Sequence, residues 1–421
     1  MVKWKIDMNA HTEMHSQLQG RRHGHTLPRK FFTDPDFYQL DLENIWYRDW
    51  LFVGHDCELA KSGSYMTLQV GDYPVVVVRS GDGTVRAFHN SCRHRGSRIC
   101  AGEKGTAAKL VCPYHSWTYE LDGRLLYARD MGPGFDPKEH GLKPVHCQSI
   151  GGFIWICLAR QAPDLSQFRA QVEPYLLPHR LRETKVAFES TIVENGNWKL
   201  VWENNRECYH CAGNHPELCR TFPEAPTVTG VEGAMNDPMI VKHWEACEAI
   251  GLPSRFEMSE DGQYRAARMP LLRNAVSYTM SGKAAVRRPL SDEISEPKIG
   301  TMLLFHYPTT WNHILSDHAV SFRVLPVGPK QTQVTTKWLV HKDAVEGVDY
   351  SIEDLTKVWL ATNDQDRQIV EENQIGVSSP AFEPGPYSPP HEGGVMQFVE
   401  WYAAFMERAL GGEGARLRSV A

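Results

Sequence analysis

The chain has 421 residues, 42% of them hydrophobic and 23% charged, which is the composition of a folded protein long enough for two domains. The formal net charge is −6 and the lysines and arginines are scattered, so neither nucleic acid nor an anionic membrane is expected as a partner. No apolar run approaches the roughly 18 residues of a membrane span, and the N-terminus lacks the apolar core of a signal peptide, so we expect a soluble, cytoplasmic protein.

The first part of the chain is predicted to hold a polar arm, a helix and a β domain. Residues 1–33 are polar and weakly periodic, which predicts an extended or partly ordered arm. Asp34-Pro35 then begins a helix, so that residues 1–45 form the arm and helix. From 46 to 165, short β-rich runs are separated by Gly-Asp-Gly, Asp-Gly and Gly-Gly turns, which predicts an all-β, antiparallel domain with inserted loops.

The remainder of the chain is predicted to form a second domain over residues 180–421. A polar stretch with several prolines at about 160–185 marks the crossing between the domains. Residues 300–342 hold at least three β runs, and helical spacing follows at about 350–375 and 394–410. This order predicts an α+β fold, in which helices pack against an antiparallel sheet.

Two Cys–His pairs lie in the first domain. Cys92 and His94 are followed, after 17 residues, by Cys112 and His115. Two thiolates and two imidazoles can bind a structural zinc ion, or a [2Fe–2S] cluster in which one iron takes both cysteines and the other both histidines. A zinc finger usually keeps its cysteines together and its histidines together, whereas here each loop carries one of each. The spacing therefore favours the cluster, which accepts one electron at a time.

A second group of metal-binding side chains lies in the second domain. Glu203, Glu207 and His210 are spaced by four and three residues, which places them on one face of a helix. His215 is five residues beyond His210, and Gly213-Asn214 could end the helix and bring it back. Two histidines and one carboxylate leave positions of Fe(II) open for O2. The alternative is a polar helix with surface histidines.

Taken together, these motifs resemble the Rieske non-haem iron oxygenase family, α subunit. Arg95-Gly96 after the first Cys–His pair, Ser116-Trp117 after the second, and the acid–acid–His–His spacing above carry the resemblance. It implies an all-β Rieske domain and a C-terminal, helix-grip-like antiparallel sheet with helices. It also implies two cofactors, a [2Fe–2S] cluster and a mononuclear Fe(II). The implied cluster ligands are Cys92, His94, Cys112 and His115.

The resemblance also assigns the mononuclear iron ligands. His210 and His215 match the two iron-binding histidines of the family. The third ligand is an Asp followed by Glu five residues later and Gln eight residues later, which Asp366, Glu371 and Gln374 satisfy.

Glu207 matches an acid that, in the family, connects the iron site to a cluster histidine of a neighbouring subunit. This role implies a homotrimer and makes Glu207 a predicted catalytic residue. Most members have Asp at this position. Glu is found at this position in the subgroup that oxidises quaternary ammonium compounds, so Glu207 indicates that this chain resembles that subgroup.

The runs NWKLVWENNRECYHC and EENQIGVSSPAFEPGPYSPP look most like oxygenases that demethylate glycine betaine or proline betaine (stachydrine), or that cleave carnitine. Hydroxylation of an N-methyl group gives a carbinolamine that releases formaldehyde. The chain has no GxGxxG motif after a strand, so a separate flavin- or ferredoxin-type reductase is expected to deliver electrons from NAD(P)H.

A quaternary ammonium group has no N–H, so aromatic rings are expected to bind it. The candidates, each also explicable as core packing, are Trp202, Tyr209, Trp244, Tyr307 and Trp311. The sequence selects no Arg or His for a substrate carboxylate. Other interpretations are an aromatic-ring dioxygenase α subunit, a Rieske electron carrier and a zinc-stabilised binding protein. Cys208 and Cys211 are interpreted as packing residues.

Overall fold

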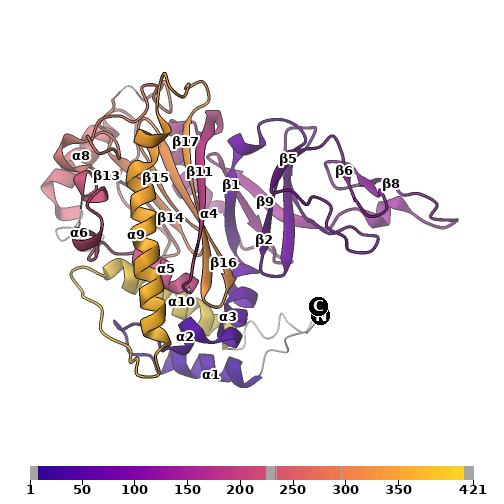
Figure 1. Cartoon of the computed structure of the whole chain (residues 1–421), viewed down its shortest axis with the longest axis horizontal. Coiled ribbons are helices and arrows are strands. Elements are labelled where there is room, and N and C mark those ends of the chain that lie inside the picture. The colour runs from indigo at the N-terminus through magenta and orange to yellow at the C-terminus, as the bar shows by residue number, and fades with distance from the viewer. Residues whose placement is uncertain (1–7, 224–232, 234, 295, 412–421) are drawn as a thin grey trace. The chain divides into compact units, whose positions relative to one another are not determined.

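The structure is a computed structural model that describes residues 8–223, 233, 235–294 and 296–411. Its backbone forms two compact units (Figure 1). One contains residues 46–165 and 181–183, and the other contains the described residues of 1–45, 166–180 and 184–421. Within the described ranges, no helix has both the length and the apolar character needed to cross a bilayer.

The smaller unit is built on antiparallel strands. Seven of them form one sheet in the order β1-β10-β9-β4-β3-β2-β5, and three short strands form a second sheet in the order β6-β7-β8. The valines at 75–78 in β3 are all buried, as expected for a strand covered on both faces. The strands are β1 (Trp50–His55), β2 (Ser64–Val70), β3 (Tyr73–Arg79), β4 (Val85–His89), β5 (Lys104–Thr106), β6 (Leu110–Val111), β7 (Thr118–Tyr119), β8 (Leu125–Tyr127), β9 (Pro144–Ile150) and β10 (Phe153–Cys157).

The larger unit contains a seven-stranded antiparallel sheet in the order β11-β17-β16-β15-β14-β13-β12. Its strands are β11 (Thr184–Glu194), β12 (Glu257–Met258), β13 (Tyr264–Met269), β14 (Thr301–His306), β15 (Thr310–Ile314), β16 (Ala319–Gly328) and β17 (Gln331–His341). Register places one row of directly paired residues on a single face of the sheet, namely Arg265, Phe305, Trp311, Phe322 and Thr336.

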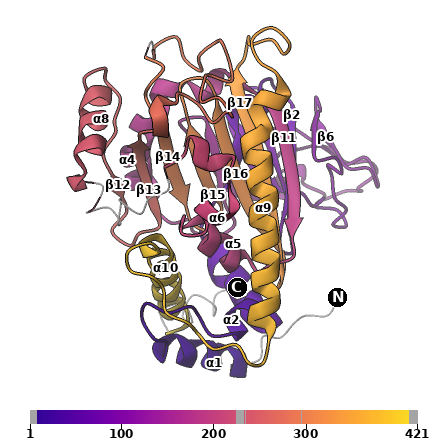
Figure 2. The ribbon, with the colours of Figure 1, turned by 60° about the vertical axis from the view of Figure 1, so that its left-hand side comes forward.

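Helices cover that face, and α9 (Ile352–Ser378) is the longest of those described (Figure 2). The amide of Asn363 donates to the Thr336 hydroxyl at 2.9 Å, and the Trp359 ring lies 5.0 Å from that of Phe322, so α9 packs directly on the sheet. Further helices of this unit are α4 (Ser166–Leu176), α5 (Trp198–Asn205), α8 (Pro238–Glu248) and α10 (Gly393–Leu410). The predicted α+β fold and the two helices predicted near 350–375 and 394–410 are confirmed.

The N-terminal arm differs from its prediction. An extended or partly ordered arm was predicted, but residues 8–19 form helix α1 (Met8–Gln19), in which Met14 and Leu18, one turn apart, are fully buried. Residues 1–7 of the predicted arm lie outside the described residues. The apolar spacing is present but sparse, and tertiary burial decides the helix. The predicted helix after Asp34-Pro35 is α3 (Pro35–Asp41), where the Asp34 carboxylate accepts from two backbone amides of the first turn.

The remaining elements are short. They are α2 (Lys30–Thr33), α6 (Cys211–Asn214), η1 (Leu42–Trp46), η2 (Asp56–Leu59), η3 (Pro137–His140), η4 (Leu177–His179), η5 (Leu181–Glu183), η6 (Leu218–Arg220) and η7 (Leu272–Asn274).

Candidate metal centres

Two loops of the smaller unit carry the predicted cluster ligands. Cys92 lies in the loop after β4, and Cys112 lies between β6 and β7. Each loop closes with the same kind of turn: the Gly96 amide donates to the Cys92 carbonyl at 2.9 Å, and the Ser116 amide donates to the Cys112 carbonyl at 3.0 Å. Gly96 and Ser116 both have positive φ, which allows each loop to fold back over its cysteine. Each loop therefore presents its Cys and its His from a single tight turn.

The side chains of these loops suit a cluster with two sulfur and two nitrogen ligands. The rings of His94 and His115 lie 4.7 Å apart, and His94 stacks on Trp117. The Nδ1 atom of His94 is buried without a hydrogen-bond partner. Burial also raises the pKa of the Cys92 thiol, whose sulfur lies 3.3 Å from the Tyr119 hydroxyl. Binding to a cluster would give the buried Nδ1 atom of His94 a partner and would use the buried Cys92 sulfur as a ligand.

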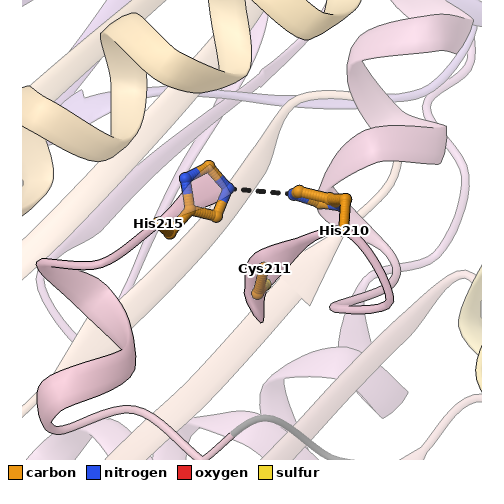
Figure 3. A group of neighbouring side chains, drawn as sticks. All are labelled: His210, Cys211 and His215. Atoms are coloured by element: carbon orange, nitrogen blue, oxygen red, sulfur yellow. Dashed lines mark hydrogen bonds between the residues drawn. The ribbon is translucent and has the colours of Figure 1, made fainter. Parts of the chain in front are cut away.

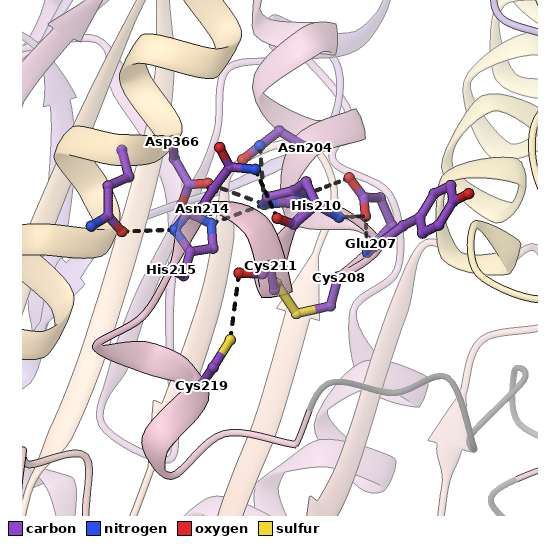
Figure 4. Close-up of a disulfide and its surroundings, with 11 residues drawn as sticks. Asn204, Glu207, Cys208, His210, Cys211, Asn214, His215, Cys219 and Asp366 are labelled. Carbon is purple, nitrogen blue, oxygen red and sulfur yellow. Dashed lines mark hydrogen bonds and ion pairs between the residues drawn. A yellow bond between two sulfur atoms is a disulfide. The ribbon is translucent and has the colours of Figure 1, made fainter.

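The second centre combines side chains from three segments of the larger unit. His210 lies in the turn between α5 and α6, His215 directly follows α6, and Asp366 lies on α9 (Figure 4). The two Nε2 atoms face each other at 3.0 Å (Figure 3). Asp366 Oδ1 lies 3.3 Å from His210 Nε2 and 3.0 Å from His215 Nε2. Three ligands at right angles, each about 2.1 Å from one ion, would lie about 3.0 Å apart.

The outer nitrogens of both histidines are already bonded. Nδ1 of His210 lies 2.5 Å from a carboxylate oxygen of Glu207, and Nδ1 of His215 lies 2.8 Å from the amide oxygen of Gln365. In the neutral form of each ring the single N–H is then on Nδ1, which leaves a lone pair on Nε2 for a metal ion. Burial lowers the pKa of His210, but the carboxylates of Asp366 and Glu207 outweigh it and raise this pKa to about 9, so a bound ion would take the place of a proton on Nε2. Asp366 Oδ1 has no hydrogen-bond partner of good geometry. The three atoms fit an ion placed between them.

Charge in this centre is consistent with the same conclusion. Burial alone would raise the pKa of Asp366, but the two adjacent histidines hold it below its usual range. The carboxylate therefore stays ionised and is available as a ligand. Two imidazoles and one carboxylate form a facial set that suits non-haem Fe(II) and leaves positions for O2.

The segments that carry these two centres match known families. Residues 49–145 match the Rieske [2Fe-2S] domain, and residues 181–408 match the ring hydroxylating alpha subunit (catalytic domain). The second match covers more than half of the chain. The chain belongs to the Rieske non-haem iron oxygenase family. The two predicted cofactors, a Rieske [2Fe–2S] cluster and a mononuclear iron, are therefore those of its family.

Several known proteins are similar to this Rieske oxygenase. It is 48% identical over 96% of its length, and over 94% of the relative, to a glycine betaine monooxygenase oxygenase subunit from Pseudomonas aeruginosa (strain UCBPP-PA14). It is 49% identical to a protein of the same description from Chromohalobacter salexigens, covering 96% of this chain and 91% of the relative.

Solved structures show the same fold at low identity. A quaternary ammonium Rieske monooxygenase in complex with L-carnitine has a TM-score of 0.70 at 20% identity, covering 93% of this chain and 98% of the other. Naphthalene 1,2-dioxygenase from Rhodococcus sp. has a TM-score of 0.67 at 16% identity, covering 96% and 99%.

The helix expected to carry the second motif is interrupted. α5 ends at Asn205, so Glu207 and His210 lie in a turn and do not share a helix face with Glu203. Both backbone amides at 209 and 210 donate to the Glu207 carboxylate, which holds the turn in place. α6 ends at Asn214, and His215, which directly follows it, lies next to His210 as expected. Neither Gly213 nor Asn214 adopts the left-handed conformation that was predicted to end the helix.

The interpretation of the two cysteines beside the predicted iron ligands as packing residues is wrong. Cys208 and Cys211 are joined by a disulfide, which brackets His210 in the chain (Figure 4). The thiol of Cys219 donates to the Cys211 carbonyl at 3.5 Å. A C-x-x-C spacing is the signal that could have predicted the bond.

The five aromatic candidates divide into three groups. In the first group, the ring centroid of Trp202 lies 4.7 Å from that of Tyr307 and 5.1 Å from that of Trp311. Trp244 lies on α8 against Phe256. Tyr209 is 61% exposed and stacks on His391.

Sequence reasoning did not predict the contacts that support the predicted iron ligands and the turn before α5. Gln365, besides contacting His215, donates to Glu217 at 3.0 Å. Glu371 accepts from both the backbone and the side-chain amide of Asn195, and Gln374 accepts from the backbone of Asn197. The intervals from Asp366 identified Glu371 and Gln374 in the sequence but predicted no structural role for either residue. Their position shows that α9 fixes the turn that leads into α5.

Proposed function

We propose that this chain is the oxygenase subunit of a two-component glycine betaine monooxygenase. The observation that carries the proposal is identity of 48–49% to proteins of that description over nearly the whole of both chains. Proteins described as carnitine monooxygenase oxygenase subunits match only 45% of this chain, at 33% identity. Glu207, in place of the usual Asp, also favours a quaternary ammonium substrate.

The proposed reaction hydroxylates one N-methyl group. One oxygen atom of O2 enters the C–H bond, and the other leaves as water after uptake of two electrons and two protons. The carbinolamine then breaks its C–N bond. Its hydroxyl proton moves to the amine nitrogen, so the products are formaldehyde and dimethylglycine. When bound, the cluster passes single electrons and the mononuclear iron activates O2 beside the substrate.

Residues of this chain would orient the two histidines that bind the mononuclear iron. Glu207 and Gln365 fix the outer nitrogens of His210 and His215, so both rings present Nε2 inward. We infer that electrons arrive from a separate NAD(P)H-dependent reductase in the cytoplasm, and that three copies assemble. In this assembly Glu207 would carry the electron path between the cluster of one copy and the iron of the next.

The test is product analysis on the reconstituted protein. The full chain, loaded anaerobically with iron and sulfide, is supplied with a generic reductase, NADH and O2, and formaldehyde is measured with glycine betaine, proline betaine, carnitine and naphthalene. Glycine betaine should give formaldehyde and dimethylglycine in equal amounts. Formation of a ring diol from naphthalene without formaldehyde from any betaine would refute the proposal.

A further inference from the structure

Arg206 occupies an unusual environment beside the iron ligands. It caps the C-terminus of α5, directly before Glu207. Its guanidinium carbon lies 3.9 Å from the ring centroid of Phe305 and 5.9 Å from that of Tyr307. One Nη atom donates to Gln397 at 3.3 Å, whereas Nε is buried without a hydrogen-bond partner. The cation is therefore supported by aromatic rings and one neutral amide.

A second arginine approaches the same ring. Arg265, paired with Phe305 across β13 and β14, has its guanidinium carbon 5.3 Å from the Phe305 centroid and 5.2 Å from that of Phe256. Burial, and then the positive charge of Arg206, lower the pKa of Arg265 to about 9. Within the described residues, neither Arg206 nor Arg265 forms an ion pair with a carboxylate.

Two like charges in a partly buried site are costly. Each cation–π contact returns about 0.5–2 kcal/mol, but an aromatic ring does not neutralise a charge or remove the repulsion between two guanidinium groups. Buried charges in proteins are usually paired. This pair therefore lacks an anion, and a carboxylate is the anion that matches the fork of a guanidinium.

A hydroxyl group completes the site. The Tyr307 side chain is fully buried, and its hydroxyl has no hydrogen-bond partner of good geometry. Burial raises the pKa of the Tyr307 hydroxyl, and the neighbouring positive charge of Arg206 offsets part of this rise. Tyr307 also contacts Trp202, which in turn contacts Trp311. Donors that lack an anionic partner among the described residues thus lie next to the aromatic residues that are candidates for the ammonium end of a betaine.

We propose that Arg206, Arg265 and the Tyr307 hydroxyl bind the carboxylate group of the substrate. This inference rests on the proposed function, because glycine betaine carries a carboxylate beside its trimethylammonium group. The site would select betaines over choline, which has the same ammonium group but a neutral hydroxyl in place of the carboxylate. Neither arginine belongs to the iron-binding residues, so their effect on substrate is separable from metal binding.

The test measures binding without turnover. Glycine betaine and choline are titrated calorimetrically into the anaerobic holoenzyme and into the Arg265→Gln and Arg206→Gln variants. Arg255→Gln is the matched control, because Arg255 also lies over an aromatic ring, that of Trp244, but already pairs with Glu248. Each site variant should weaken glycine betaine binding roughly tenfold or more and leave choline unchanged, with the control like wild type. Binding of glycine betaine within about twofold of wild type in both folded variants would overturn the site.

A second measurement needs no variant. Phenylglyoxal modifies accessible arginines, and mass spectrometry of the wild-type holoenzyme reports Arg206 and Arg265 separately. Glycine betaine or acetate should protect both residues, and choline should not. If acetate protects them but glycine betaine is neither bound nor demethylated, the carboxylate site stands and the proposed function fails. If glycine betaine is demethylated but no carboxylate protects either arginine, the site fails and the proposed function stands.

Discussion

Nδ1 of His215 donates to the amide oxygen of Gln365 at 2.8 Å, and Gln365 is the residue next to Asp366. One turn of α9 therefore carries one predicted iron ligand and also orients a second, which lies 150 residues before Gln365 in the chain. The amide group of Gln365 is fixed in turn by its contact with Glu217. Such outer contacts set the tautomer and direction of a metal-binding histidine.

Gln365→Leu should lower the affinity for the mononuclear iron roughly 10–100-fold, because His215 loses the acceptor that orients it. Iron content after dialysis against a graded chelator measures the change, and the absorption of the Rieske cluster should not alter. The control is Gln368→Leu, three residues along the same helix, where the side chain contacts only the exposed Asp364 among the described hydrogen bonds. Equal loss of iron in both variants would contradict the orienting role.

Asp366→Ala should abolish mononuclear iron binding and turnover, because it removes the only carboxylate within reach of both Nε2 atoms among the described ion pairs. The cluster spectrum should remain. Asp364→Ala is the control, since Asp364 is exposed and pairs with Arg367 at 2.6 Å. Metal analysis and formaldehyde assay report the result, and retained activity in Asp366→Ala would refute the assignment.

Glu207→Gln should keep both metals but slow electron transfer to the iron centre. The amide can still accept hydrogen bonds from the turn at 209 and 210, but it removes the negative charge beside His210. Stopped-flow oxidation of the pre-reduced cluster, with substrate and O2 present, measures the step. A cluster oxidation rate equal to that of wild type would show that the charge of Glu207 plays no part.

The Cys208–Cys211 disulfide should be detectable chemically. Both residues should resist alkylation in the unfolded, non-reduced protein and react after treatment with a dithiol. The double Cys→Ser variant should bind the mononuclear iron more weakly, because the bond ties the chain on both sides of His210. Labelling of both cysteines without prior reduction would show that the bond is absent in solution.

Stability of the larger unit should fall in acid. Burial lowers the pKa of His306 to about 4, below the value of about 6.5 in an unfolded chain. The native state therefore binds fewer protons, so this contribution is fully present above pH 6.5 and is lost as the pH falls toward 4. The loss is about 3 kcal/mol. Urea unfolding across this range should show a shallower decline in His306→Phe, and identical slopes would exclude His306 as a source.

The metal-binding motifs could be predicted from the sequence, whereas the N-terminal helix could not. The metal-binding types and spacings at 92–115 and 203–215, and the helix carrying Asp366, were visible because coordination chemistry constrains side chains in short segments. Helix α1 was not, because its burial depends on distant partners such as α10 rather than on its own weak apolar pattern.

The sequence by itself determined the α+β class and the family, and it predicted a ligand set for each of the two metal centres. Only the tertiary structure decided what surrounds them: Gln365 on His215, the disulfide beside His210, and two arginines on one phenylalanine ring. Arg206 and Arg265 are 59 residues apart in the sequence, and no local rule relates them. Strand register and helix packing bring such groups together, because buried charges and hydrogen bonds depend on neighbours that the chain supplies only once it is folded.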